Sequence, residues 1–586
     1  MPPAIDMCAP MRSIRLSFSI VTRRMRIVAL CAAAIITATV VAQFAQVGNA
    51  TVDVQLLAIN DFHGALEPPS GGGGRIGSAD AGGIEYLGTH LARLKATNPN
   101  TIVVSAGDNI GGTPLLSSLF HDEASIEALN VAGLQLSALG NHELDEGWWE
   151  LYRIQKGGCH PVDGCQDGTP FSGASFRYLA ANVTLDPQQA DPQFVALAGV
   201  QGTQPRPLLP AYEIGEVDGV RIGFIGLILQ AAPAVIIPAS IRGLTFKPEA
   251  DAANDAVRAL REQGVRAIVV LMHQGGDQRG DVNACDGMSR DLLELVNGFS
   301  DDIDVVVSGH SHQAYNCTIG RKLVTSASSS GRVLTDIDLQ VRRSDGEVVA
   351  KQARNIVVTR EVPREPAQSA LIARYLPVAE KIGSRVVGTI VSSLVRQPSD
   401  AGEFPLGSVV ADAFLEAGTG PGGGAELAFT NPGSIRADVV AREASHSGSP
   451  VTYSELFSVL PFGNEVIVKS LSGDALMEVL EQQFGADRTR IMQMSRGVTY
   501  AYDPSRPAGH RIDRASMRIN GAPLDLARRY RVATNSFLWG AGDGLQALSR
   551  GADPVTVGVD VDVLADYVSR HSPLTAPTLD RIRRIR

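Results

Sequence analysis

Histidines, carboxylates and one asparagine recur in the first half of this chain, each close behind a short apolar run. The runs span residues 52–59, 101–105, 136–140, 267–272 and 304–308, and the polar residues that follow them are Asp61, His63, Asp108, Asn141, His142, His273, His310 and His312. Short apolar runs of this kind predict buried strands. Because ligands collect at the carboxyl ends of strands in layered α/β sheets, we expect these side chains to lie together.

The chemistry that these side chains suit is metal binding. Carboxylate oxygens mixed with imidazole nitrogens favour zinc, manganese or similar divalent ions. A carboxylate such as Asp108 can bridge two ions, the arrangement that stabilises both the attacking and the leaving oxygens in phosphoryl transfer. Each motif is weak alone, because a histidine at a strand end is often only a hydrogen-bonded structural residue. The ordered set predicts a centre of two divalent metal ions.

The elements that position these residues alternate between strands and helices. Helical patterns at 82–97 and 123–133 lie between the apolar runs, which predicts a layered α/β domain. Near residues 359–366 the sequence becomes charged and contains proline, and a helical stretch at 367–382 follows. We therefore predict a first domain at 51–360, a linker helix at 361–382 and a second α/β domain at 383–586.

Two glycine-rich segments, at 71–74 and 420–424, are predicted to be mobile surface loops. Neither is followed by the Lys-Ser/Thr pair of a phosphate-binding P-loop, so we do not expect them to hold phosphate.

The first 50 residues have the composition of an export signal. Arginines between residues 12 and 26 precede an uncharged apolar stretch at 27–42, and small residues follow at 48–50. This is the order of a cleaved secretory signal, although a retained membrane anchor is the alternative because the stretch is only slightly too short to span a bilayer. We predict a signal peptide at 1–50, no membrane span after cleavage, and a secreted, periplasmic or cell-envelope protein.

The charge of the mature chain limits its partners. Removing the leader, with its five arginines and one aspartate, leaves 47 basic and 61 acidic residues, a formal net charge of −14. A broad basic surface for nucleic acid is therefore not expected. A small phosphorylated substrate would have to be bound by local metal ions or arginines.

Four cysteines remain after the leader, an even number that is typical of disulfides in an oxidising compartment. Cys159 and Cys165 bracket a short loop that a disulfide can close, and Cys285 and Cys317 would form a second bridge. The alternative is a zinc–thiolate site, which normally needs two close pairs of cysteines, and this sequence has one.

Taken together, the metal motifs resemble those of the calcineurin-like metallophosphoesterases, and their details are similar to the 5′-nucleotidase branch. The resemblance covers essentially the whole mature chain. It implies a four-layered αββα metallophosphoesterase domain followed by an α/β 5′-nucleotidase C-terminal domain. It also implies two ligand sets, which are Asp61, His63, Asp108 and His312 for one metal and Asp108, Asn141, His273 and His310 for the other. By the same resemblance, His142 stabilises the transition state or protonates the leaving group, and Asp145 orients it.

The C-terminal region resembles the family's substrate clamp. Residues 429–436 are similar to its Asn-Gly-Gly-x-Arg loop, while 460–464 and 535–544 match the segments that sandwich the base and bind the ribose. The implied substrate-binding residues are Asn431, Gly433, Arg436, Phe462, Phe537 and Asp543. A phenylalanine is most often a core residue, but the Gly, Pro and Asn neighbours of these two favour loops.

The sequence departs from the family pattern at three places. Pro432 replaces the usual first glycine of the arginine loop, Glu403 stands near a position where many relatives have a phosphate-binding arginine, and Trp539 replaces a small residue. These differences leave the preferred substrate open.

The sequence therefore predicts an exported metal-dependent phosphoric monoester hydrolase that releases phosphate from nucleoside 5′-phosphates. Two enzyme alternatives use the same metals: a 2′,3′-cyclic-nucleotide phosphodiesterase with 3′-nucleotidase activity, and a nucleotide-sugar or dinucleotide hydrolase. A surface binding or adhesion protein on the same fold is the non-enzyme alternative, against which the complete ligand set argues.

Overall fold

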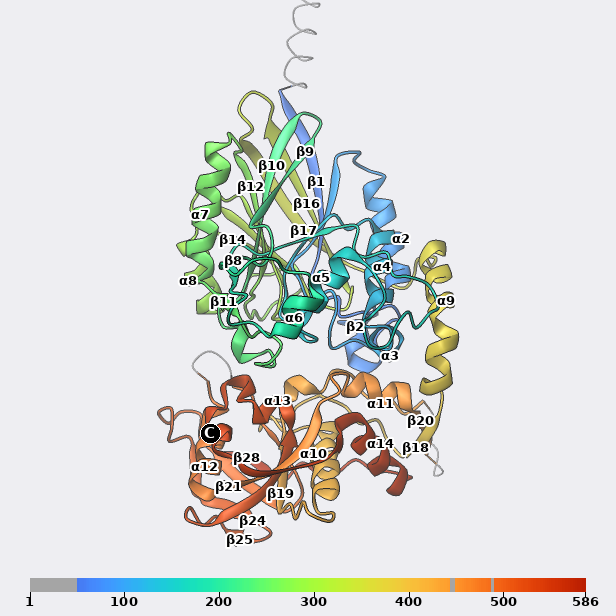
Figure 1. Cartoon of the computed structure of the whole chain (residues 1–586), viewed down its shortest axis with the longest axis vertical. Helices are drawn as coiled ribbons and strands as arrows, with labels where there is room; N and C mark the ends of the chain where they lie inside the picture. Colours follow the sequence, from blue (N-terminus) through green and yellow to red (C-terminus); the bar gives the residue numbers. More distant parts are fainter. Residues whose placement is uncertain (1–49, 443–447, 486–488, 586) are drawn as a thin grey trace, which may run out of the picture.

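The computed structural model describes residues 50–442, 448–485 and 489–585. They form two domains, drawn one above the other in Figure 1, with a long helix along one side. The predicted export signal lies outside the described residues except for its last position. Among the described residues, no helix combines the length and apolar character that crossing a membrane requires.

The N-terminal domain is built on two six-stranded sheets. The first has the order β17-β16-β1-β4-β5-β6, formed by Val348–Val357, Val333–Arg342, Thr51–Ile59, Thr101–Ser105, Leu136–Ala138 and Arg177–Leu179. The second has the order β14-β15-β13-β12-β10-β9, formed by Ala314–Ile319, Lys322–Ala327, Val305–Ser308, Ala267–His273, Val220–Ile228 and Tyr212–Val217. The inner faces of the two sheets pack against each other in one hydrophobic core. Helices cover the outer faces, and strands that are buried on both faces consist almost entirely of apolar residues.

Helices cover the outer face of each sheet and complete four layers. Helices α2 (Ile84–Lys95) and α4 (Glu123–Ala132) cover the first sheet, and α7 (Glu249–Glu262) and α8 (Arg290–Gly298) cover the second. The domain also contains three short helices, α3 (Leu115–Ser118), α5 (Trp148–Lys156) and α6 (Pro192–Leu197). The predicted αββα architecture is confirmed.

The connecting helix α9 spans Pro366–Gly383, so residues 361–365 of the predicted linker precede it. Its N-terminal capping residue is Glu365, whose carboxylate accepts from the Gln368 backbone N–H. The helix contacts α2, α3 and α4 of the first domain and α11 of the second, and therefore lies along both domains (Figure 1).

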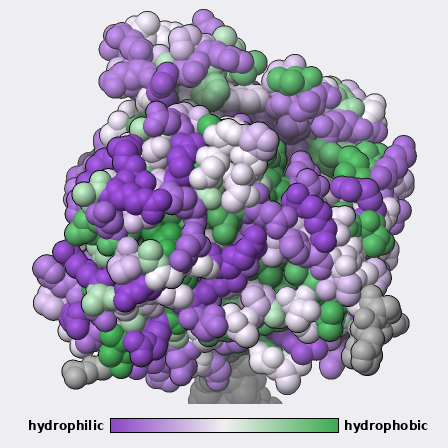
Figure 2. Space-filling model, turned by 90° about the horizontal axis from the view of Figure 1, so that it is seen from below, coloured by the Kyte–Doolittle hydropathy of each residue, from purple (hydrophilic) through white to green (hydrophobic). Residues whose placement is uncertain are grey.

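The C-terminal domain contains a five-stranded sheet in the order β22-β19-β26-β21-β27, formed by Gln493–Met494, Leu427–Thr430, Arg529–Asn535, Glu465–Ser472 and Ala552–Val559. A four-stranded sheet has the order β25-β24-β23-β28, formed by Ala522–Pro523, Ile512–Ile519, Val498–Tyr502 and Ile582–Arg584. Its helices are α10 (Pro405–Gly418), α11 (Tyr453–Val459), α12 (Gly473–Gln482), α13 (Ser536–Trp539) and α14 (Asp560–Arg570). Seen from below, this end of the molecule is largely hydrophilic with scattered hydrophobic residues (Figure 2).

The glycine-rich run at 71–74 differs from its prediction as a mobile surface loop. It forms a short 3₁₀ helix whose Gly72 N–H donates to the Asp438 carboxylate of the C-terminal domain at 3.1 Å. The Ser70 hydroxyl donates to the Asp438 carbonyl. This segment therefore contributes to the contact between the domains.

Candidate active site

The strand ends of the N-terminal domain bring all seven predicted metal ligands together. One group contains Asp61, His63 and His312, and a second contains Asp108, His273 and His310; within each group the ligand atoms lie within 4.8 Å of one another. The Asn141 side-chain oxygen joins the second group, 3.1 Å from His273 Nε2 and 3.0 Å from His310 Nδ1. His273 is the last residue of β12 rather than the residue after it.

Asp108 lies between the two groups. Its Oδ2 is 3.0 Å from His273 Nε2 and 3.7 Å from His63 Nε2. A carboxylate with one histidine from each group beside it is placed to bridge two ions.

The residues present fit a pair of divalent cations. Asp61 and Asp108 are buried, and within the described residues neither pairs with a lysine or arginine. Buried carboxylates without a cation are costly. The Nδ1 atoms of His63 and His273 face the carbonyls of Gly111 and Ala106, each at 2.8 Å, which leaves the Nε2 lone pairs free for metal.

The backbone at these strand ends is strained. Asp61, His63, Asp108, His310 and His312 have positive φ angles of 49°, 46°, 52°, 68° and 56°. Residues other than glycine avoid this left-handed region at a cost of about 1–2 kcal/mol each, and strained residues of this kind cluster at functional sites. This backbone strain indicates that the five residues have a functional role, because it does not stabilise the fold.

His142 and Asp145 form a dyad beside the metal groups. His142 Nδ1 lies 2.8 Å from Asp145 Oδ2, and the His142 backbone N–H donates to Asp108 Oδ1 at 2.9 Å. Burial alone would lower the pKa of His142, but the charges of Asp145 and Asp108 outweigh it and raise this pKa. Asp145 is thus placed to orient the imidazole and to stabilise its protonated form.

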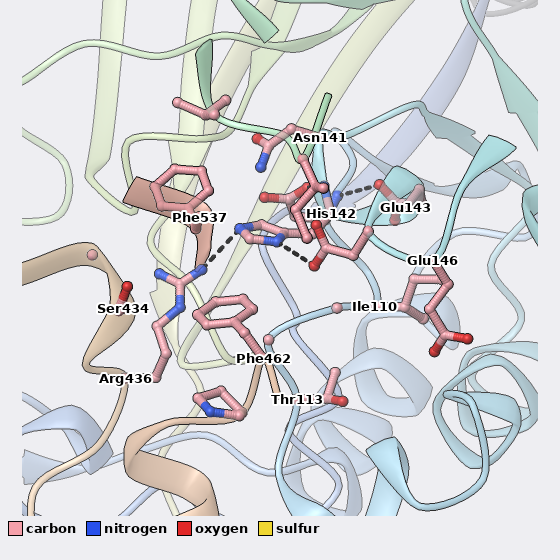
Figure 3. Close-up of a pocket in the computed structure, with 18 of the residues that line it drawn as sticks. Ile110, Thr113, Asn141, His142, Glu143, Glu146, Ser434, Arg436, Phe462 and Phe537 are labelled. Carbon is pink, nitrogen blue, oxygen red and sulfur yellow. Dashed lines mark hydrogen bonds and ion pairs between the residues drawn. The ribbon is translucent and has the colours of Figure 1, made fainter. Parts of the chain in front are cut away.

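The predicted clamp residues reach the same place from the other domain. Arg436 Nη2 is 2.9 Å from His142 Nε2, and the Phe462 ring stacks on the imidazole with 5.5 Å between ring centroids. Gly112 makes this approach possible, because a Cβ atom there would come within 2.8 Å of the Phe462 ring. Figure 3 shows Arg436 between Phe462 and Phe537, facing His142.

The ribose-binding candidate is fixed by amide contacts. Asn431 Nδ2 donates to Asp543 Oδ2 at 2.7 Å, and the Asn431 oxygen accepts from the Ser434 hydroxyl and from Asn535. The second Asp543 oxygen remains available to sugar hydroxyls, with Arg490 Nε 3.7 Å away. Gly433 lies in the same loop, exposed to the pocket.

One cavity of about 360 Å³ is lined by residues of both domains, including Asp108, His142, Arg436, Phe462, Phe537 and Asp543. Both phenylalanines are partly exposed there instead of buried in the core. Trp539, by contrast, is buried and donates its indole N–H to the Ile467 carbonyl. Glu403 is buried, and its carboxylate accepts from the backbone N–H groups of Arg581 and Ile582. Neither Trp539 nor Glu403 lines the cavity.

Comparison with known proteins identifies the two domains. The profile of the calcineurin-like phosphoesterases matches residues 54–314, and that of the 5′-nucleotidase C-terminal domain matches residues 382–550. The chain belongs to the 5′-nucleotidase family of metallophosphoesterases. The two matched domains together identify the chain as a metal-dependent phosphoester hydrolase.

Similar proteins carry several functional names. The chain is 31% identical to Endonuclease YhcR of Bacillus subtilis over 88% of its own length, but spans only 40% of that relative. It is 29% identical to Cell wall protein Lmo0130 of Listeria monocytogenes, covering 91% of this chain and 69% of that protein. A 5′-nucleotidase precursor from Thermus thermophilus has a similar structure, with a TM-score of 0.73, 25% identity, and coverage of 91% and 99% of the two chains.

Sequence reasoning assigned no role to Glu143, which lies within the Gly-Asn-His-Glu motif of this phosphoesterase domain. Its buried carboxylate accepts from the backbone N–H groups of Gly140 and Asn109 at 2.7 Å and of Asp108 at 3.0 Å. Burial and the neighbouring Asp108 raise the pKa of Glu143 to about 7. Glu143 thus joins the loops that carry Asp108 and Asn141. An acidic residue between two site residues was the only signal in the sequence.

Both predicted disulfides are formed. The Cα atoms of Cys159 and Cys165 are 4.7 Å apart, and those of Cys285 and Cys317 are 5.3 Å apart. The first closes a loop beside α5, and the second connects β14 to the segment before α8.

Proposed function

We propose that this chain is an exported two-metal 5′-nucleotidase that releases phosphate from nucleoside 5′-monophosphates for nucleotide scavenging. The observation that carries the proposal is one cavity in which four of the candidate metal ligands, Asp108, Asn141, His310 and His312, lie opposite Arg436 and the two phenylalanines. A phosphate at the metal groups would place its ester oxygen near His142 and its nucleoside toward the other domain.

The chain's own residues would share the chemistry as follows. Two bound cations would polarise the phosphoryl oxygens and make the attacking water more acidic. The ligands proposed for them are Asp61, His63, Asp108, Asn141, His273, His310 and His312. Arg436 would bind the phosphate through its planar guanidinium, and His142, oriented by Asp145, would give a proton to the leaving 5′-oxygen.

The clamp would select the nucleoside. Phe462 and Phe537 are placed to stack on the two faces of a base, an interaction that tolerates any base. Asp543 would accept hydrogen bonds from the ribose hydroxyls. The net charge of −14 for the mature chain favours such a small substrate over nucleic acid.

Substrate comparison tests the proposal. Phosphate release would be measured for AMP, ADP, ATP, 3′-AMP, 2′,3′-cyclic AMP, UDP-glucose and single-stranded DNA, with added zinc or manganese. AMP should give the highest kcat/KM. A clear preference for the cyclic diester, the nucleotide sugar or DNA would refute the assignment, and no turnover of any substrate would favour a binding protein.

Clamp variants test the division of work between the domains. Phe462→Ala and Phe537→Ala should each raise KM for AMP about tenfold or more, since one base–aromatic stack contributes ~1–3 kcal/mol. Hydrolysis of a small aryl phosphate, which has no base to sandwich, should change much less. Phe457→Ala is the matched control, because Phe457 is also partly buried but lies outside the cavity. Equal losses on both substrates would mean that the clamp residues support the fold instead.

A further inference from the structure

A histidine held between two carboxylates lies next to the His142–Asp145 dyad, and the proposed reaction gives this histidine no role. His121 Nδ1 is 2.8 Å from Glu146 Oε2, and His121 Nε2 is 2.9 Å from Asp163 Oδ2. Asp163 belongs to the loop that the Cys159–Cys165 disulfide closes. The three residues come from three separate segments of the first domain, so the contacts tie those segments together.

Two residues of this cluster, His121 and Glu146, lie at the active site. Glu146 directly follows Asp145, which accepts from His142. His121 and Glu146 line the same cavity as that dyad, and Glu146 is visible beside it in Figure 3. A displacement of Glu146 would therefore be transmitted to the Asp145 carboxylate through a single peptide unit.

The residue after His121 supports the metal side of the site. The buried Asp122 carboxylate accepts from the Gly111 N–H at 3.0 Å and from the Thr113 and Ser117 hydroxyls at 2.6 and 2.7 Å. The Gly111 carbonyl in turn faces His63 Nδ1. His121 and Asp122 both have left-handed backbones, with φ angles of 48° and 62°. Such conformations persist only when surrounding contacts hold them, which these hydrogen bonds do.

We propose that His121, braced by Asp163 on the disulfide-closed loop, is a positioning residue that holds Glu146, and through it the Asp145–His142 dyad, in its working geometry. The inference rests on the proposed function only in taking His142 as the catalytic group. It assigns a role to the Cys159–Cys165 disulfide that goes beyond stability, because the loop it closes supplies one of the two carboxylates that fix His121.

A metal ion is the main alternative occupant of this cluster, since ligand atoms of His121, His160 and Asp163 lie within 4.8 Å of one another. The rings of His121 and His160 are stacked, however, with centroids 3.7 Å apart and planes 14° apart. Lone pairs in parallel ring planes do not converge on one ion. The histidines of the two metal groups are inclined at 56° and 70° instead. The ring geometry therefore favours a hydrogen-bonded cluster of side chains over a third metal site.

Two variants separate this role from a general loss of structure. His121→Asn removes the imidazole and keeps a residue that tolerates a left-handed backbone. Asp163→Asn changes an exposed side chain that contacts His121 and, at 3.4 Å, His160. Val162→Ala, on the same loop and 82% exposed, is the matched control. Activity would be measured with a small aryl phosphate, which needs the metals and His142 but no clamp, and bound metal would be counted by elemental analysis.

We expect both variants to lower kcat about tenfold, the lower end of the range known for the outer hydrogen-bonding partners of metal-ligating histidines, with KM and metal content unchanged. The double variant should be no slower than His121→Asn alone, because the two residues act along one path. Reduction of the disulfide should lower kcat of the wild type and not of His121→Asn. Val162→Ala should match the wild type.

Three results would overturn the proposal: kcat within twofold of wild type in both variants, a fall in metal content that equals the fall in kcat, or a third metal ion that His121→Asn removes. Failure of the nucleotidase assignment is recognised separately. A wild-type enzyme that cleaves the aryl phosphate but not AMP would refute the proposed substrate and leave this test intact.

Discussion

Glu143→Gln tests how the two loops that carry metal ligands are held. Glu143 Oε2 accepts from the N–H groups of Gly140 and Asp108, and Oε1 accepts from that of Asn109. Glutamine has nearly the same shape but a single acceptor oxygen. Its amide group would face one of these N–H donors, so that a buried donor loses its partner. A hydrogen bond to a charged group contributes about 1.5–3 kcal/mol, and one of the three is lost outright.

The consequence should appear first in metal binding. A loss of this size at residues that hold ligands corresponds to metal affinity lower by about 10–100-fold. Metal would be titrated into chelator-treated protein at pH 8, above the raised pKa of Glu143, with bound metal and AMP turnover measured together. Activity should recover in part with excess metal. Glu249→Gln is the control, because Glu249 is also buried and accepts a backbone N–H, from Gln230, outside the cavity. Equal metal affinities for Glu143→Gln and wild type would refute the reasoning.

Four further predictions follow from the same contacts. A bridged pair requires about two metal ions per chain, and Asp108→Ala should bind fewer. Full metal occupancy of this variant by elemental analysis would contradict a bridging role. His142→Ala should lower kcat by roughly 10²-fold or more with metal content intact, and an unchanged kcat would make this residue structural. Cys285→Ala should lower the free energy of unfolding by ~2–4 kcal/mol, and reductant should lower the wild-type Tm more than that of the variant. For His121, burial lowers the pKa but the hydrogen bonds to its two carboxylate partners outweigh it and raise the pKa to about 9. Its stabilisation is therefore complete below pH 6.5 and lost as pH rises through 9, so the Tm difference between wild type and His121→Asn should shrink over that range; a constant difference would contradict it.

The sequence by itself determined the architecture and which polar side chains the strand ends bring together. Strand β4 lies where the apolar run at 101–105 predicted it, and helix α4 ends one residue before the predicted boundary. This worked because strands that are buried on both faces are continuous apolar runs, and because ligands at strand ends are adjacent in the sequence to the runs that position them. The four cysteines were also paired from spacing and parity alone.

Only the tertiary structure decided what depends on contacts between distant segments. No local pattern predicts that Glu143 binds three backbone N–H groups, two of them more than 30 residues away, or that Gly72 donates to Asp438 across the domain contact. The position of His121 between Glu146 and Asp163 has the same origin, since each partner comes from a different loop. Side-chain periodicity records which face of an element is buried. It does not record which loops meet, because that is set by the packing of whole layers, and in this protein the meeting of loops brings Arg436 to His142.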